Sequence, residues 1–238
     1  MTTSTPAPSY TGFRFPQEII AHAVWLYHRF SLSYRDVEEL LAERGIIVLD
    51  ETVRQWCFRF GQTYANQLRR RRAHPGDKWH LDEVFLTINR KTHFVWRAVD
   101  QHGNVLAILV QRRRNKAAAK KFFRKLLNGC PYVPHVLITD KLGSYAAAKQ
   151  EVMPRVEHRK HKYLNNWAEN SHQPTRQREH TMCGFKSAGQ AQRFLSTFGP
   201  IREHFCPRCQ RVRAADYRRA RVHQFQVWNE VASLQMAA

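Results

Sequence analysis

Apolar side chains recur at helical spacing in three stretches near the start of the chain, and these stretches predict three consecutive helices. The first stretch, residues 17–30, follows Pro16, a residue that favours the beginning of a helix. The second stretch is residues 34–45, and the third is residues 51–70. The apolar positions of the first stretch are Ile19, Ile20, Ala23, Val24 and Tyr27.

Short capping signals separate the three predicted helices. Ser33 precedes the second helix and Asp36 stands three residues later, which makes an approximate capping box. Gly45 closes that helix, and Asp50 is placed to cap the third. This order of helices, turn and link predicts a helix-turn-helix, with a plain three-helix bundle as the alternative.

The third predicted helix carries candidate DNA-binding residues. Arg54, Gln55 and Arg59 lie early on it, where a recognition helix offers side chains to base edges and phosphates. After this helix comes a basic stretch, residues 69–77, in which Pro75 and Gly76 interrupt helical structure. We therefore expect a domain boundary there.

Beyond this boundary the pattern changes to the short apolar runs that are typical of strands. The predicted strands are residues 79–88, 92–100, 104–111, 134–140 and 156–163. The predicted helices between and after them are residues 115–128, residues 143–152 and a helix from Asn165 that Pro174 must bend or restart. This order predicts a mixed α/β domain around a five-stranded sheet.

The charge balance favours nucleic acid as a partner. The chain has 39 Lys and Arg against 19 Asp and Glu, a formal net charge of +20. A folded domain with this excess repels itself unless a polyanion is near, and each phosphate that it neutralises releases counterions. Ribosomal binding and an acidic membrane surface are weaker alternatives. No apolar run approaches the roughly 20 residues that span a bilayer.

The cysteines and the first ten residues indicate a reduced, cytoplasmic protein. The Ser/Thr/Pro-rich start lacks the apolar segment of a signal peptide. The odd number and scatter of the cysteines argue against a disulfide framework. Cys206 and Cys209 form a single CPRC pair, either part of a zinc site, which needs four ligands, or two reduced thiols. The five cysteines are Cys57, Cys130, Cys183, Cys206 and Cys209.

Three acidic residues stand at positions that suggest a metal site. Asp82 lies inside an apolar strand, where a carboxylate is costly unless it is paired or metal-bound. Asp140 ends the predicted central strand, and Glu169 lies on the helix that follows. Glu83 points to the opposite face of the strand from Asp82, so we favour Asp82 as the ligand. Carboxylate oxygens suit Mg²⁺, and a two-metal site catalyses phosphoryl transfer. Ordinary capping or salt-bridged acids are the alternative.

The strings around these acids resemble a known family. WHLDEVF, VLITDKLGSY and NNWAENSHQPTRQRE are similar to the three acidic motifs of DDE transposases of the IS6 (IS26-like) insertion-sequence family. The similarity runs from about Phe15 to Phe205. In this family a basic residue follows the third acid by seven positions, and Arg176 stands seven after Glu169. Two helical turns would put both on one face, although Pro174 lies between them.

The resemblance implies an RNase H-like catalytic domain that depends on two Mg²⁺ ions, with Mn²⁺ as a substitute. It implies that Asp82, Asp140 and Glu169 are the metal ligands and that Arg176 contacts DNA near the scissile phosphate. The expected enzyme binds terminal inverted repeats as a homodimer or larger assembly, exposes 3′-hydroxyl groups and joins them to target DNA. Its expected location is the bacterial nucleoid, with no membrane partner.

The expected division of the chain follows from these observations. The ranges are a disordered lead over 1–14, a helix-turn-helix domain over 15–68, a basic linker over 69–77, a catalytic domain over 78–205 and a basic helical tail over 206–238. The tail is expected to contact either DNA or a second subunit. The run 111–115, QRRRN, either holds a phosphate or is a solvated turn.

Several residues near the third acid have two interpretations. Lys160 and Lys162, with His158, His161 and His172, either line a DNA groove or are solvated. Trp167 either stacks on an unpaired base or packs in the core.

Two other functions remain open. One is a domesticated or inactive helix-turn-helix regulator, which would be expected to have lost an acidic residue, and none of the three is missing. The other is an RNase H-like nuclease without strand transfer.

Overall fold

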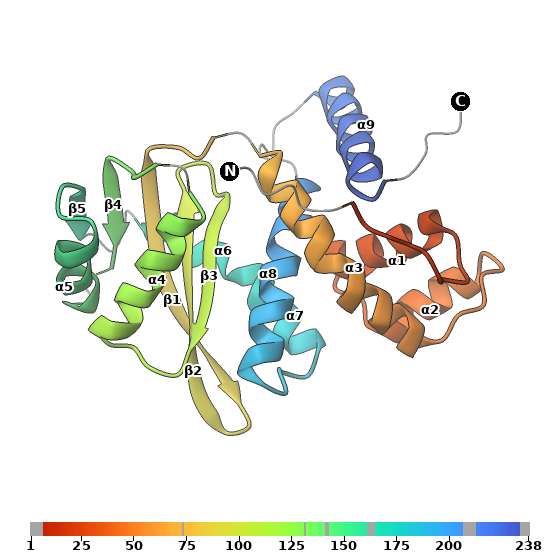
Figure 1. The fold of residues 1–238 in the computed structure, drawn as a ribbon, viewed down its shortest axis with the longest axis horizontal. Coiled ribbons are helices and arrows are strands. Elements are labelled where there is room, and N and C mark those ends of the chain that lie inside the picture. The colour runs from red at the N-terminus through yellow and green to blue at the C-terminus, as the bar shows by residue number, and fades with distance from the viewer. Residues whose placement is uncertain are drawn as a thin grey trace. The chain divides into compact units, whose positions relative to one another are not determined.

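The structure is a computed structural model, and it describes residues 7–72, 74–130, 132–140, 143–160, 165–206 and 213–233, without the side chains of Asn166, Trp167 and Glu169. The chain forms two compact units (Figure 1). Unit 1 comprises residues 1–72 and 196–238, and unit 2 comprises residues 73–195.

Three helices of unit 1 follow the order that the sequence predicts. They are α1 (Gln17–Arg29), α2 (Tyr34–Ala42) and α3 (Asp50–Arg70). The capping box is confirmed, since the Ser33 backbone N–H donates to Asp36 at 2.7 Å and the Asp36 N–H donates to the Ser33 hydroxyl at 3.1 Å. Gly45 follows α2 with φ of +75°, a conformation that favours glycine.

The start of α3 differs from the expected cap. Asp50 is the first residue of the helix rather than its cap, and Leu49 stands at the cap position without a side-chain hydrogen bond. Glu38 of α2 accepts instead from the Asp50 backbone N–H, at 2.9 Å. The N–H groups of Thr52 and Val53, which an Asp50 cap would have served, bond the Leu49 carbonyl oxygen instead.

Unit 1 is completed by residues from the other end of the chain. The later residues of α8 (Ala188–His204) and the whole of α9 (Ala214–Val231) belong to it. Trp228 of α9 packs edge-on against Tyr64 of α3 with ring centroids 5.2 Å apart, and Phe205 lies 5.9 Å from Trp25 of α1. This division differs from the expected boundary at 205, because aromatic residues on both sides of that boundary pack in one core.

Part of the expected disordered lead is ordered. The Tyr10 hydroxyl hydrogen-bonds the Tyr64 hydroxyl at 2.6 Å and donates to the Ala232 carbonyl oxygen at 2.7 Å. The rings of Tyr10 and Phe13 also pack on Phe60. Within the stretch expected to be a disordered lead over 1–14, Tyr10 and Phe13 thus have defined contacts with the buried Phe60 and Tyr64. Residues 1–6 lie outside the described residues.

Unit 2 is built on a sheet with strand order β3-β2-β1-β4-β5. The strands are β1 (Lys78–Ile88), β2 (Lys91–Asp100), β3 (Val105–Gln111), β4 (Val136–Thr139) and β5 (Glu157–Lys160). β1, β2 and β3 pair antiparallel, whereas β4 and β5 run parallel to β1. This mixed topology is the RNase H-like fold, so the predicted fold class is confirmed.

Helices cover both faces of the sheet (Figure 1). α4 (Lys116–Asn128) and α5 (Gly143–Val152) share an apolar core with alternate β1 residues, among them the fully buried Trp79 and Leu81. α6 (Asn166–Ser171) packs on β1 and β2, and α7 (Gln173–Thr181) follows it. The chain thus restarts its helix next to Pro174, as the sequence predicts.

Candidate metal centre and nucleic-acid interface

Two of the three predicted acids lie side by side at one end of the sheet. Asp82 is on β1, and Leu81 before it pairs with Thr139, the last residue of β4. Asp140 directly follows Thr139, so it stands beside Asp82 at the point where β4 ends. The side chain of Asp82 is 13% exposed and that of Asp140 is 31% exposed. Both carboxylates are therefore partly withdrawn from water.

Glu83 joins this pair, which the sequence argument did not expect. The three residues Asp82, Glu83 and Asp140 each offer a carboxylate oxygen, and these oxygens lie within 4.8 Å of one another. Glu83 faces the α4 and α5 side of the sheet, as strand alternation requires, because its carboxylate bonds Tyr145 of α5. β4 ends at Thr139, and the carboxylate oxygens of Glu83 and Asp140 approach each other at this end of the sheet.

Hydrogen bonds hold the buried Glu83 carboxylate. Its Oε1 accepts from Arg114 Nε at 2.6 Å, and its Oε2 accepts from the Tyr145 hydroxyl. Burial raises the pKa of Glu83, and the nearby Asp140 raises it further, whereas the bonds from Tyr145 and Arg114 lower it. Arg114 also lies 3.6 Å from an oxygen of Asp140. One arginine therefore contacts two of the clustered acids.

His172 lies on the other side of the sheet, with Nε2 3.6 Å from an oxygen of Asp82. Burial lowers its pKa well below the usual value, and the positive charges of Arg97 and Arg176 lower it further. The imidazole is therefore neutral near pH 7 and does not offset the charge of Asp82.

This donor set fits a hard divalent cation. Three closely spaced carboxylates repel one another unless a cation or protons balance them. All of the clustered donors are oxygen atoms, which Mg²⁺ and Mn²⁺ prefer over softer ligands. Asp82 and Asp140 are each partly exposed at the end of the sheet, so a cation can reach their carboxylates from solvent.

The helix that carries Glu169 is fixed over β1 and β2 at both of its ends. Asn165, just before α6, donates from Nδ2 to the Leu81 carbonyl oxygen at 2.9 Å. Arg97 of β2, which pairs with Asp82 across the strands, donates to the carbonyl oxygen of Ser171 at the end of α6 and to the Thr175 hydroxyl of α7. The structure therefore places α6 on the two strands, and the side chain of Glu169 lies outside the described residues.

The predicted basic residues near the third acid are only partly described. Arg176 is exposed on α7 and Lys160 is exposed at the end of β5. Arg176 and Glu169 lie on successive helices rather than on one continuous helix, since α6 ends at Ser171. Lys162 and the side chain of Trp167 lie outside the described residues. His158 hydrogen-bonds Thr139 at 2.9 Å, and His161 is outside the described residues.

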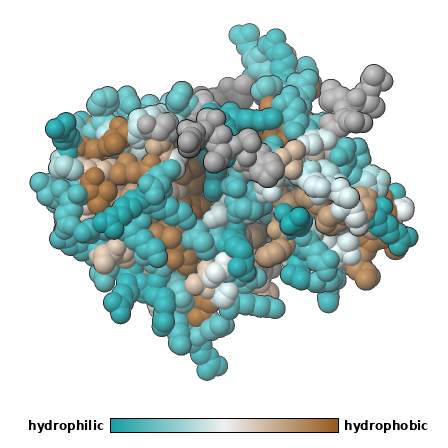
Figure 2. Space-filling model, viewed as in Figure 1, coloured by the Kyte–Doolittle hydropathy of each residue, from teal (hydrophilic) through white to brown (hydrophobic). Residues whose placement is uncertain are grey.

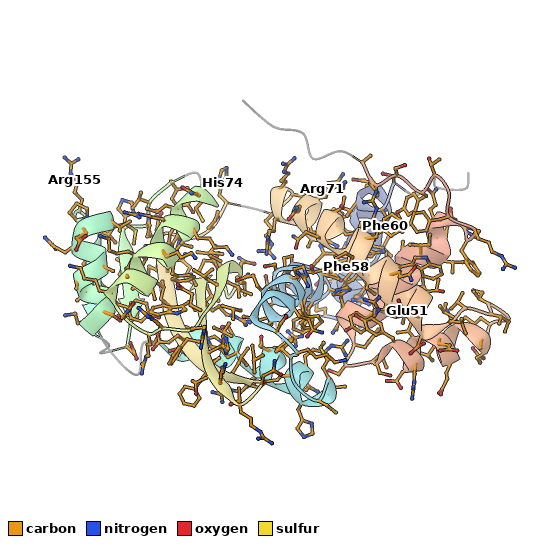
Figure 3. The ribbon with its side chains drawn as sticks, turned by 60° about the horizontal axis from the view of Figure 1, so that its bottom comes forward. Glu51, Phe58, Phe60, Arg71, His74 and Arg155 are labelled. Atoms are coloured by element: carbon orange, nitrogen blue, oxygen red, sulfur yellow. The ribbon has the colours of Figure 1, made fainter. Side chains whose placement is uncertain are left out.

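The recognition-type residues of unit 1 share one surface pocket. Arg54, Gln55 and Arg59 line a pocket of about 340 Å³ together with Phe13 and Phe58. Phe58 is 67% exposed and lies on α3 with Glu51 (Figure 3). Glu51 accepts two hydrogen bonds from Arg54, each 2.6 Å, and one from Gln55 at 3.2 Å. The structure thus groups the three predicted residues, and it adds an acid and an exposed aromatic ring.

Sequence reasoning missed Glu83, Arg97 and Arg114 as parts of the site. A signal for Arg97 was present, because it is a charged residue inside an apolar strand, the same feature that singled out Asp82. Glu83 was set aside on strand alternation alone. Arg114 could not be separated from Arg112 and Arg113 by sequence, since the three stand together in a polar loop.

The described helices and cysteines bear on two further expectations, a membrane partner and a zinc site. The described helices include none long and apolar enough to cross a membrane. Hydrophilic side chains cover most of the face seen in Figure 2. Cys206 is half-buried, and Cys209 lies outside the described residues, so the CPRC pair stays a prediction.

Comparisons with known proteins agree with the geometry. The family profile described as a DDE domain, of the IS240 transposase type, matches residues 76–206. The chain is 31% identical over 164 residues to the transposase for the insertion sequence-like element IS431mec of Staphylococcus aureus strain N315, which covers 67% of this chain and 73% of that protein. It is 30% identical, with the same coverage, to the Staphylococcus aureus transposase for the insertion sequence element IS257 in transposon Tn4003.

Two solved structures show a more distant likeness. The catalytic core domain of BIV integrase matches with a TM-score of 0.40 and 14% identity, over 63% of this chain and 99% of that one. The Mos1 transposase catalytic domain matches with a TM-score of 0.41 and 12% identity, over 76% of this chain and 98% of that one.

Proposed function

The chain belongs to the IS6 family of DDE transposases, and from this premise we propose that it cleaves DNA at the terminal inverted repeats of an insertion sequence and joins the ends to target DNA. The observation that carries the proposal is the cluster of carboxylate oxygens of Asp82, Glu83 and Asp140 within 4.8 Å of one another. A cluster of this kind in a strongly basic chain suits phosphodiester chemistry.

The residues proposed to hold the metal are Asp82, Asp140 and Glu169. When bound, a pair of Mg²⁺ ions, or Mn²⁺ in their place, supplies activation of the attacking oxygen and stabilisation of the leaving oxygen. Asp82 and Asp140 are held by neighbouring strands, so their separation is fixed by the pairing of β1 with β4. Asn165 and Arg97 fix the position of α6, which carries Glu169.

The proposed reaction has two steps. In the first, the oxygen of water bonds to phosphorus and the bond from phosphorus to the 3′-oxygen breaks, which leaves a 3′-hydroxyl and a 5′-phosphate. In the second, that 3′-hydroxyl oxygen bonds to a target phosphorus, the target strand loses its own bond to a 3′-oxygen, and the proton ends on the released oxygen. Each phosphodiester bond that forms in the second step replaces one that breaks.

Unit 1 is proposed to recognise the terminal repeat. Arg54, Gln55 and Arg59 are exposed on α3 and line one pocket, and their proposed partner is a groove of the DNA. Arg176, Lys160, Lys162 and Trp167 are proposed to contact DNA near the metal site. Because two element ends must be held together, we infer a homodimer or larger assembly on DNA, in the bacterial cytoplasm at the nucleoid.

A strand-transfer assay tests this function. The substrate is a labelled duplex that ends in the element's own terminal repeat, with a plasmid target and Mg²⁺. We expect joined products from the wild type, and a loss on the order of 10³-fold or more for Asp82→Asn, Asp140→Asn and Glu169→Gln, since each removes a metal ligand. Asp77→Asn, an exposed acid just before β1, is the matched control and should keep activity.

The other outcomes separate the alternatives. Cleavage without joining, in wild type, would indicate a nuclease. Tight binding with neither reaction, unchanged by the three substitutions, would indicate a DNA-binding regulator and overturn the catalytic proposal.

A further inference from the structure

Arg114 differs from the two arginines that precede it in the loop between β3 and α4. Its Nε donates to Glu83 Oε1 at 2.6 Å, and its Nη2 also contacts that oxygen. The same Nη2 lies 3.6 Å from Asp140 Oδ2. Arg112 and Arg113 are exposed and share the loop. The run QRRRN is therefore not a uniform solvated turn, because its last arginine is fixed at the proposed metal site.

Glu83 fixes Arg114 because it is itself held on both sides. Its side chain is 1% exposed, and its second oxygen accepts from the hydroxyl of Tyr145, a fully buried residue of α5. Both carboxylate oxygens thus have hydrogen-bond partners, as a buried acid requires. With its oxygens engaged in this way, Glu83 is better suited to position Arg114 than to bind a cation.

The Arg114 side chain remains accessible although it is anchored. It is 38% exposed, whereas Glu83 is almost completely buried. A guanidinium group has five N–H donors in a planar fork, and a carboxylate uses only part of that set. Arg114 can therefore hold Glu83 and still donate to an oxygen of a bound molecule.

The chemistry beside Arg114 indicates what that molecule is. The three clustered carboxylates repel a DNA strand, and each phosphate that approaches them needs nearby positive charge. A fixed guanidinium stabilises charge on a phosphate without reorganising when the reaction occurs. Arginine also matches phosphate geometry with two parallel hydrogen bonds.

We propose that Arg114, positioned by Glu83 and Tyr145, binds a phosphate of the DNA strand next to Asp140. This inference rests on the proposed function, since it assigns a substrate contact in the same site. Glu83 and Tyr145 are positioning residues, and Asp82 and Asp140 remain the proposed metal ligands.

A phosphate-neutralisation scan tests the contact without catalysis. Terminal-repeat duplexes carry a single uncharged methylphosphonate at successive positions around the cleavage point, and binding is measured by fluorescence anisotropy without divalent metal. The wild type should bind about tenfold more weakly when the contacted phosphate is neutralised, because a charge-assisted hydrogen bond is lost. Arg114→Gln should show no additional loss at that position.

Arg113→Gln is the matched control, an exposed arginine in the same loop, and it should keep the wild-type pattern. An equal loss for wild type and Arg114→Gln at every position would overturn the contact. Strand transfer by the wild type is measured in parallel. If the wild type joins no DNA, the proposed function fails. If the wild type joins DNA but shows the same losses as Arg114→Gln at every neutralised phosphate, only the Arg114 contact is refuted.

A second measurement separates positioning from metal binding by Glu83. Glu83→Gln and Tyr145→Phe keep the size of the side chains, and Mn²⁺ binding is followed by electron paramagnetic resonance. Glu83→Gln should bind Mn²⁺ with an affinity within about threefold of wild type, whereas Asp82→Asn should lose Mn²⁺ binding. In the phosphate scan, Glu83→Gln should no longer show the loss of DNA affinity at the contacted phosphate. If Glu83→Gln loses Mn²⁺ as fully as Asp82→Asn, Glu83 is a metal ligand and the positioning role is wrong.

Discussion

The two units of this transposase are assembled in different ways. Unit 2 is one continuous stretch, residues 73–195, in which neighbouring strands and helices pack on one another. Unit 1 is closed by residues 196–238, which return from the other end of the chain to the first three helices. The proposed DNA-reading helix therefore depends on contacts with the far end of the chain, whereas the proposed metal site is formed within one continuous stretch of it.

The units also use acid–arginine pairs differently. In unit 1, Glu51 and Arg54 form a bidentate pair with both side chains about half exposed. In unit 2, Glu83 is 1% exposed beneath the partly exposed Arg114. An exposed pair is screened by water and salt, whereas a buried acid that loses its partner retains an uncompensated desolvation cost. An acid–arginine pair thus orients exposed side chains in unit 1, whereas in unit 2 it fixes Arg114 beside the proposed metal site.

The largest expected effect comes from opening the core that closes unit 1. Phe205 is fully buried and contacts the rings of Trp25, Phe225 and Trp228. Phe205→Ala should destabilise unit 1 by about 3–5 kcal/mol, since it leaves a cavity in an aromatic core. Hydrogen exchange should accelerate in the amides of α1 and α9 together.

Phe122→Ala is the control for this comparison, because Phe122 is equally buried but lies in the core of unit 2. It should accelerate exchange in the sheet and leave α1 and α9 protected. If Phe205→Ala instead accelerated exchange in β1 and β2 as strongly as in α1, the two units would not be independent in stability.

The contrast between the units also explains what could be predicted from sequence. Strand and helix ranges of unit 2 followed from local patterns. Asp82 was singled out as a carboxylate inside an apolar strand, and Asp140 as the residue that ends a predicted central strand. The return of Phe205 and Trp228 to unit 1 carries no local signal, since any amphipathic helix can pack in several places. The place of Glu83 in the cluster goes with its hydrogen bonds to Arg114 and Tyr145, which lie far from it in the sequence and leave no local signal.

A smaller effect is expected from removing the buried arginine that holds α6. Arg97 is 4% exposed and donates to the Ser171 carbonyl oxygen and the Thr175 hydroxyl. Arg97→Met should destabilise unit 2 by about 2 kcal/mol, because it leaves the buried Thr175 hydroxyl and the partly buried Ser171 carbonyl oxygen without this donor. Exchange should accelerate first in α6 and α7, as measured by mass spectrometry.

Arg90→Met is the control, since Arg90 is an exposed arginine in the turn between β1 and β2. It should leave α6 and α7 protected. Uniform acceleration across the sheet in Arg97→Met would show that Arg97 supports the whole core rather than the helix that carries Glu169.

A weaker effect is expected on the pH dependence of the stability of unit 1. The His204 Nε2 hydrogen-bonds the Gln224 carbonyl oxygen at 2.8 Å, and burial lowers the pKa of His204 below that of an unfolded histidine, about 6.5. Above that pH the residue is neutral in both states and its full contribution to stability is present. Below that pH, His204 binds a proton in the unfolded chain more readily than in the folded chain. The free energy of unfolding therefore decreases as the pH is lowered.

His204→Gln should therefore make the unfolding free energy of unit 1 less dependent on pH below about 6.5. Unfolding is followed by urea titration with tryptophan fluorescence. His135→Gln, an exposed change in unit 2, should leave the pH dependence of unit 1 as in wild type. An unchanged slope in His204→Gln would show that His204 does not resist protonation in the fold.

The smallest expected effect is on the exposed pair of unit 1. Arg54 holds the pKa of Glu51 at about 2 through two hydrogen bonds, with Gln55 as a third donor. Glu51→Gln should leave thermal unfolding unchanged, because the pair is solvated. It should lower the ratio of terminal-repeat to random-duplex affinity by up to about tenfold, since Arg54 loses the partner that orients it toward a base.

Binding to the two duplexes at several salt concentrations measures this ratio. Glu43→Gln, an exposed acid outside α3, removes the same charge and should raise affinity for both duplexes equally. A higher ratio in Glu51→Gln would mean that Glu51 withholds Arg54 from DNA rather than presenting it. The comparison would then reverse, because the exposed pair of unit 1 would inhibit binding while the buried pair of unit 2 organises its site.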